Sequence, residues 1–96
     1  MIYAKGNTVP SYSDDDKSNF TMQYYAVVNT NVFILQDNSD ATTWISSNSL
    51  ASISKSDAQT LINAKVTQSQ NEYDAMSTND RLIRRGNFRH PGFTLP

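Results

Sequence analysis

Residues 20–35, FTMQYYAVVNTNVFIL, hold the clearest structural pattern in this chain of 96 residues. From residue 20 to residue 28 the even-numbered side chains are all apolar or aromatic, and the residues between them include Thr21 and Gln23. A β-strand places these two sets on opposite faces. Residues 29–31 are polar, and asparagine tolerates the left-handed backbone that short hairpin loops need. The apolar residues 32–35 then read as a second strand. These residues therefore predict an antiparallel β-hairpin.

Two further strands are expected on either side of this hairpin in the sequence. Residues 1–5 predict a short first strand, and Gly6 ends it. Residues 42–45, with Trp44 at their centre, predict a third strand of a meander, because β-branched and aromatic residues favour strands. The link at residues 7–19 contains three consecutive aspartates, and such a run of like charges indicates an exposed loop.

Near Ser54 the spacing of apolar residues changes from the alternation of a strand to the spacing of a helix. Ser54 and Asp57 match the capping pattern of a helix start, and apolar or small side chains then recur at spacings of three and four. They are Ala58, Leu61, Ile62, Val66, Ser69, Tyr73 and Met76. We expect one helix at about residues 55–76. Residues 81–85 before Gly86 predict one or two further helical turns. Residues 87–96 contain two prolines and no period, which predicts an extended arm.

Residues 1–53 resemble an SH3-like or Tudor-like small β-barrel. The resemblance rests on strand order and aromatic placement, from the first strand at Tyr3, through the hairpin, to Trp44 and Ile45. It implies recognition of peptides, methylated side chains or nucleic acid. An OB-like barrel, or a sheet packed on the later helix, fits the same strands.

The expected fold is α+β and mostly β, within one domain. A small antiparallel meander or SH3-like barrel occupies residues 1–53. One long helix follows at residues 54–76 and packs on it. A short basic helix and an extended carboxy-terminal arm occupy residues 77–96.

Residue types narrow the chemistry of the chain. It contains no cysteine, which excludes disulfides, thiolate metal sites and cysteine nucleophiles. His90 is the single histidine, and no metal-ligand spacing surrounds it. Asp14 and Asp16 begin like a calcium loop, but Asn19 and Tyr25 stand where that loop requires glycine and glutamate. We therefore expect no enzyme activity, no cofactor and no metal site.

The aromatic side chains are expected to divide between core and surface. A small domain needs their volume inside, so we assign most large residues of the strands to the core. These are Phe20, Tyr24, Phe33, Ile34 and Trp44. Tyr25 shares a strand face with Thr21 and Gln23, which predicts that Tyr25 is exposed. Tyr25 and Trp44 are the aromatic residues that a binding module would use.

Charge is distributed unevenly. The chain has 8 basic and 9 acidic residues, yet residues 81–96 contain four arginines and no acid. The candidate interaction residues of this tail are Arg81, Arg84, Arg85, Phe88, Arg89 and Phe93. As an assembly arm, the tail would lie on the acidic body of a neighbouring subunit. As a nucleic-acid contact, it would bind phosphates and stack bases. Folding back onto its own chain is the third reading.

These observations favour a non-enzymatic structural or interaction protein. We expect it to oligomerise or to dock into a larger assembly through the helix and the tail, with self-association or another protein as the partner. The alternative is a barrel-type binding module for nucleic acid or peptide, which would use Tyr25, Trp44 and the arginines.

The sequence also bears on location. Lys5 and Gly6 interrupt the amino terminus before an apolar run forms, and the longest uninterrupted apolar run has four residues. This pattern predicts neither a signal peptide nor a membrane span. We expect a soluble intracellular protein or a component of a virus particle, since small virus-particle proteins resemble this chain in being rich in serine, threonine and asparagine.

Overall fold

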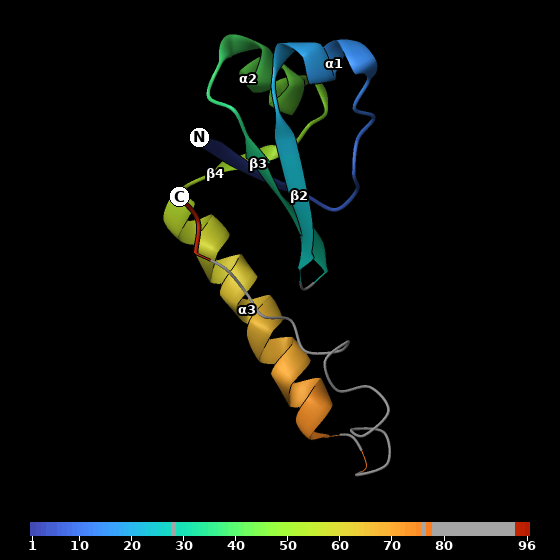
Figure 1. The fold of residues 1–96 in the computed structure, drawn as a ribbon, viewed down its shortest axis with the longest axis vertical. Helices are drawn as coiled ribbons and strands as arrows, with labels where there is room; N and C mark the ends of the chain where they lie inside the picture. The colour runs from blue at the N-terminus through green and yellow to red at the C-terminus, as the bar shows by residue number, and fades with distance from the viewer. Residues whose placement is uncertain (28, 76, 78–93) are drawn as a thin grey trace.

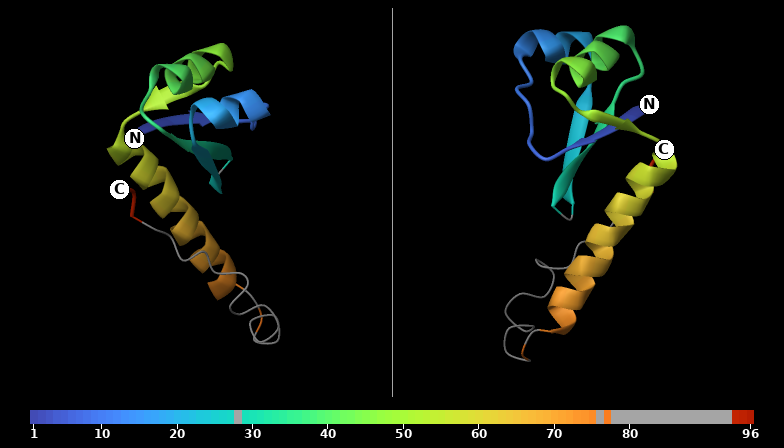
Figure 2. Two further views of the ribbon diagram at one scale, coloured as in Figure 1. Left: turned by 45° about the horizontal axis from the view of Figure 1, so that its top comes forward. Right: turned by 180° about the vertical axis from the view of Figure 1, so that it is seen from behind.

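The computed structural model describes residues 1–27, 29–75, 77 and 94–96, and it contains one antiparallel sheet with helices on both faces (Figure 1). The strands are β1 (Ile2–Gly6), β2 (Met22–Val27), β3 (Thr30–Leu35) and β4 (Ala51–Ile53). Helices α1 (Asp14–Asn19) and α2 (Ser39–Ser47) lie on one face, and α3 (Lys55–Asp74) lies on the other (Figure 2). The α+β class, with an antiparallel sheet followed by a carboxy-terminal helix, is confirmed.

The sheet is open and does not close into a barrel. Its strand order is β2-β3-β1-β4, so β1 lies between β3 and β4, and β2 and β4 form the two edges. The predicted meander of three consecutive strands is therefore wrong. The hairpin is present, but its third neighbour is the first strand of the chain, which pairs with β3 from Ile2 opposite Leu35 to Gly6 opposite Asn31.

The predicted hairpin is confirmed with shifted bounds. β2 and β3 pair from Met22 opposite Leu35 to Val27 opposite Thr30. Asn29 has a φ of 57°, which is the left-handed conformation that asparagine tolerates in tight turns. The strand begins two residues after Phe20, because Phe20 ends α1 as its carboxy-terminal cap.

The interior strand β3 joins two hydrophobic cores. Its last four residues are all buried, and strand alternation sends Val32 and Ile34 to one face and Phe33 and Leu35 to the other. The α3-side core contains Tyr3, Val27, Val32, Ile34, Ala58, Ile62 and Leu95. The α2-side core contains Ala4, Phe20, Phe33, Leu35, Ala41, Trp44 and Ile45. Burial on both faces explains why residues 32–35 are continuously apolar.

The segment predicted as the third strand is helix α2. Asn38 begins this helix, since its Oδ1 accepts a hydrogen bond from the Ala41 amide at 2.9 Å. Ala41, Trp44 and Ile45 are its buried residues, and their spacing of three and four residues places them on one helical face. Burial of this face outweighs the strand preference of the two threonines and Trp44.

The predicted loop at residues 7–19 contains the short helix α1. The Ser13 hydroxyl accepts from the Asp16 amide at 3.1 Å, and the Asp16 carboxylate accepts from the Ser13 amide at 3.0 Å. This reciprocal pair is a capping box, and the three aspartates in the first turn favour the positive end of the helix dipole. Asp14 and Asp15 are exposed as expected and Asp16 is half-buried, but the three aspartates form a helix start.

Asn38 also links the two short helices, because its Nδ2 donates to the Asn19 carbonyl at 3.0 Å. We expect Asn38→Ala to lower the free energy of unfolding by about 1–2 kcal/mol, since both the cap and this link are lost. Asn38→Asp is the matched control, because it keeps the acceptor for Ala41 and loses only the donor. Urea titrations of the two variants check this, and an equal loss in both would show that the cap contributes nothing.

The predicted long helix is confirmed as α3. The Ser54 hydroxyl accepts from the Asp57 amide at 3.1 Å, and Ala58 and Ile62 are buried against the sheet. Met76 lies outside the described residues, as do residues 81–85, where a short helix was predicted. Of the predicted arm, residues 94–96 are described.

Candidate functional site

Trp44 lies in the α2-side core. It is 6% exposed, and its indole nitrogen donates to the Ser11 carbonyl at 3.1 Å. Its ring lies 5.8 Å from the ring of Phe20 and 6.0 Å from that of Phe33, measured between centroids. The core assignment of Trp44 is confirmed, and its use as an interaction residue stays a prediction that 6% exposure does not favour.

Tyr24 and Tyr25 have exchanged their predicted places. Tyr24 is 50% exposed, whereas Tyr25 is half-buried against the α3-side core. The two side chains leave β2 on opposite faces. Tyr25 points to the face that α3 covers, while the hairpin extends past α1 and α2 on the face that carries Tyr24 (Figure 1). The alternation of β2 correctly placed Tyr24 and Tyr25 on opposite faces. Which of the two faces is covered depends on helices that are distant in the sequence.

The basic tail residues cannot be placed on this fold. The candidate interaction residues of the tail and His90 lie outside the described residues. These candidates are Arg81, Arg84, Arg85, Phe88, Arg89 and Phe93. The described cations are the four lysines, of which Lys17 lies 3.7 Å from the Asp14 carboxylate in an exposed pair. Such a pair contributes little to stability.

The last three residues lie on their own chain. The Leu95 side chain is 2% exposed and belongs to the α3-side core. The Leu95 amide donates to Gln59 Oε1 at 2.8 Å, and the Tyr3 hydroxyl donates to the Pro96 carbonyl at 3.2 Å. We call the surface of β1 and α3 that holds residues 94–96 the C-terminal groove. Residues 94–96 therefore contact their own chain, and the arginines on which the three alternatives for the tail depend lie outside the described residues.

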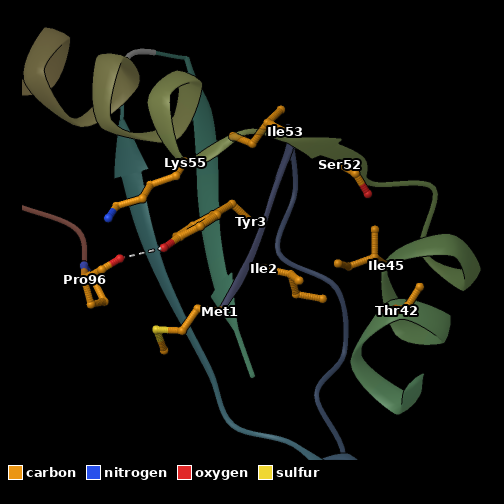
Figure 3. Close-up of a pocket in the computed structure, with 9 residues that line it drawn as sticks. All are labelled: Met1, Ile2, Tyr3, Thr42, Ile45, Ser52, Ile53, Lys55 and Pro96. Atoms are coloured by element: carbon orange, nitrogen blue, oxygen red, sulfur yellow. Dashed lines mark hydrogen bonds between the residues drawn. The ribbon is translucent and has the colours of Figure 1, made fainter. Parts of the chain in front are cut away.

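A hollow of about 490 Å³ opens beside Pro96, between α2 and the start of α3 (Figure 3). It is lined by Met1, Ile2, Tyr3, Thr42, Ile45, Ser52, Ile53, Lys55 and Pro96. A second hollow, of about 530 Å³, adjoins Thr94 and Leu95 on the other side, and Lys55 lines both. Residues 94–96 therefore line two hollows, and Lys55 is a lining residue of both.

The first hollow has the composition of a binding surface. Its lining offers the hydroxyls of Tyr3, Thr42 and Ser52 and the Lys55 amine above an apolar floor, with no imidazole and no side-chain carboxylate. Among the described residues, no group of three or more His, Cys, Asp or Glu side chains is placed to hold a metal ion.

Five aspartates lie on or beside the two short helices α1 and α2. Asp14, Asp15 and Asp16 lie in the first turn of α1, Asp40 lies in the first turn of α2, and Asp37 immediately precedes the cap of α2. The Asn38–Asn19 hydrogen bond holds these segments together. These aspartates belong to the face of the sheet opposite α3.

Sequence reasoning missed the groove residues Tyr3 and Gln59. Neither residue belongs to a motif. The spacing of three and four residues that predicted α3 includes Ala58 and Leu61 but not Gln59, which lies between them. No helix in the described ranges combines the length and hydropathy that crossing a bilayer requires. Comparisons of the chain with protein-family models, with curated proteins and with solved structures found no match.

Proposed function

We propose that this chain is a non-enzymatic interaction protein that docks into a larger assembly, and that the C-terminal groove is a docking surface. The observation that carries the proposal is the way the groove holds Leu95, with the side chain buried and the amide bound to Gln59. The ligand class that follows is an extended peptide that carries an apolar residue for the Leu95 position.

Three kinds of contact support peptide recognition by the groove. It buries one apolar side chain, offers Gln59 as an acceptor for a main-chain amide, and offers the Tyr3 hydroxyl as a donor to a main-chain carbonyl. Main-chain hydrogen bonds combined with one apolar pocket are a recurring mode of peptide recognition.

The same contacts can form between two chains. Every copy carries both the groove and its own residues 94–96, so exchange between copies creates no new interface and loses none. The tail therefore serves as a first partner for the groove, either on its own body or on a neighbouring one. Lys55, which lines both adjoining hollows, would attract acidic residues beside the bound segment.

The test separates the groove from its resident tail. In the full chain, Leu95→Asp places a charge in the apolar pocket and should displace residues 94–96. A fluorescent peptide of residues 87–96 should then bind this variant about tenfold or more tightly than the wild-type chain, because the attached tail competes at high effective concentration. Fluorescence anisotropy measures both affinities.

Thr94→Asp is the matched control, since it adds the same charge at the exposed neighbouring position. We expect this variant to bind the peptide as weakly as the wild-type chain does. A Leu95→Asp chain that keeps its circular dichroism spectrum but fails to bind the peptide would overturn the proposal. Binding of a peptide that itself carries Leu95→Asp would also overturn it.

A further inference from the structure

The outer edge of β2 differs from most exposed sheet edges. In the described part of the chain, β2 pairs with β3 on one side and with no strand on the other. Its six residues, Met22–Val27, include no charged residue, no proline and no glycine. Proteins usually protect such edges with lysine, proline, a bulge or a covering loop. The other edge, β4, has only three residues.

The hydrogen-bond pattern identifies the backbone groups that face outward. The Gln36 amide donates to the Thr21 carbonyl at 3.0 Å, which marks these two residues as a bonded pair at the start of the ladder. Bonded and non-bonded pairs alternate in an antiparallel ladder. Met22, Tyr24 and Ala26 therefore direct their amides and carbonyls away from β3, toward the outer edge.

The side chains along this edge are apolar and accessible. Tyr24 is 50% exposed and Ala26 is exposed, while Met22 is partly buried against the α2-side core. The Tyr24 ring rests on Phe33, with 6.2 Å between the ring centroids. This contact holds the ring beside the edge, where it would meet any strand that adds there.

We propose that this edge pairs with β2 of a second copy of the chain, in an antiparallel arrangement with its two-fold axis at Tyr24. The outward groups of Met22, Tyr24 and Ala26 then meet those of Ala26, Tyr24 and Met22 in the second copy, and the two four-stranded sheets form one. The two Tyr24 rings lie side by side, as cross-strand aromatic pairs do.

The charge distribution permits pairing with a second copy and favours the antiparallel direction. The strand is uncharged, so pairing it with itself brings no like charges together. Only two residues separate the end of the acidic helix α1 from the start of β2. Antiparallel pairing places the two α1 helices at opposite ends of the interface, whereas parallel pairing would place their aspartates side by side. The partner uses a different surface from the C-terminal groove, so the two proposals are tested separately.

Sedimentation velocity of the full chain over a concentration series tests the inference. We expect a dimer in the wild-type chain, and a dissociation constant raised about 100-fold or more by Tyr24→Lys, which places two ammonium groups at the axis. Tyr24→Phe keeps the ring and should remain dimeric. Thr43→Lys adds the same charge on the exposed side of α2 and should also remain dimeric.

A second readout fixes the register. The chain has no cysteine, so Tyr24→Cys introduces a single thiol. Directly opposed residues of a bonded antiparallel pair have Cα atoms about 5.5 Å apart, within disulfide range, so mild oxidation should link two copies of this variant. Thr43→Cys should stay unlinked.

Three outcomes would overturn the inference. They are a wild-type chain that is monomeric throughout, a dimer that Tyr24→Lys leaves intact, and failure of the Tyr24→Cys variant to cross-link. If Tyr24→Lys does not fold, Ala26→Lys replaces it, because Ala26 is exposed at the same edge. The dimer should persist in Leu95→Asp, so a failed groove and a failed edge give different results.

Discussion

Replacing Phe33 with alanine is expected to lower the free energy of unfolding by about 3–5 kcal/mol. Phe33 has no exposed surface, and its ring contacts Trp44 in the α2-side core and the exposed ring of Tyr24. Strand β3 is hydrogen-bonded on both sides, so the backbone cannot move to fill the cavity that the ring leaves. The loss is a large share of the stability of a domain of this size.

Urea unfolding followed by circular dichroism measures this loss. Fluorescence of Trp44, the single tryptophan, reports on the same core as a second probe. Val9→Ala is the control, since Val9 is 43% exposed and its truncation should change stability by no more than about 0.5 kcal/mol. A loss below about 1 kcal/mol in Phe33→Ala would contradict the packing of α2 on this face of the sheet.

The second large effect is expected on the opposite face. Ile62 is 1% exposed and fastens α3 to the sheet in the α3-side core, which also contains Leu95. We expect Ile62→Ala to cost about 2–5 kcal/mol. Asn63→Ala is the matched control, because Asn63 is the next residue of the same helix and is exposed.

A double-mutant cycle then connects the core to the C-terminal groove. If Leu95 packs with Ile62 as one cluster, the effects of Ile62→Ala and Leu95→Ala should depart from additivity by about 0.5 kcal/mol or more. Additive losses would mean that the tail and the helix contact the sheet independently. The measurement uses the same urea titrations on four chains.

Local patterns were sufficient to predict β1, the β2–β3 hairpin and α3. Each depends on residues that are close in sequence: alternation in β2, Asn29 in the turn, and Ser54 with Asp57 at the helix start. The wrong prediction of a strand at Trp44 also came from residues that are close in sequence. The threonines before it favour a strand, while the spacing of Ala41, Trp44 and Ile45 fits a helix, and the Asn38 cap decides between them.

Long-range pairing could not be predicted in the same way. Whether the sheet closes depends on β1 entering between β3 and β4, and no local pattern records this order. Tyr24 and Tyr25 show the same limit, because alternation separates their faces without showing how far α1 and α2 reach. The docked segment that contains Leu95 is residues 94–96, and three residues are too few to show a periodic pattern.

The interior position of β1 also determines the order in which the protein can fold. Tyr3 pairs with Ile34 and with Ile53, the second of these 50 residues later in the chain. Such separation slows folding, because a long loop must close before the contacts form. During synthesis at about 5–20 residues per second, β1 leaves the ribosome several seconds before β4 exists. The hairpin closes through a short turn, whereas the strand made first is the last to gain both of its neighbours.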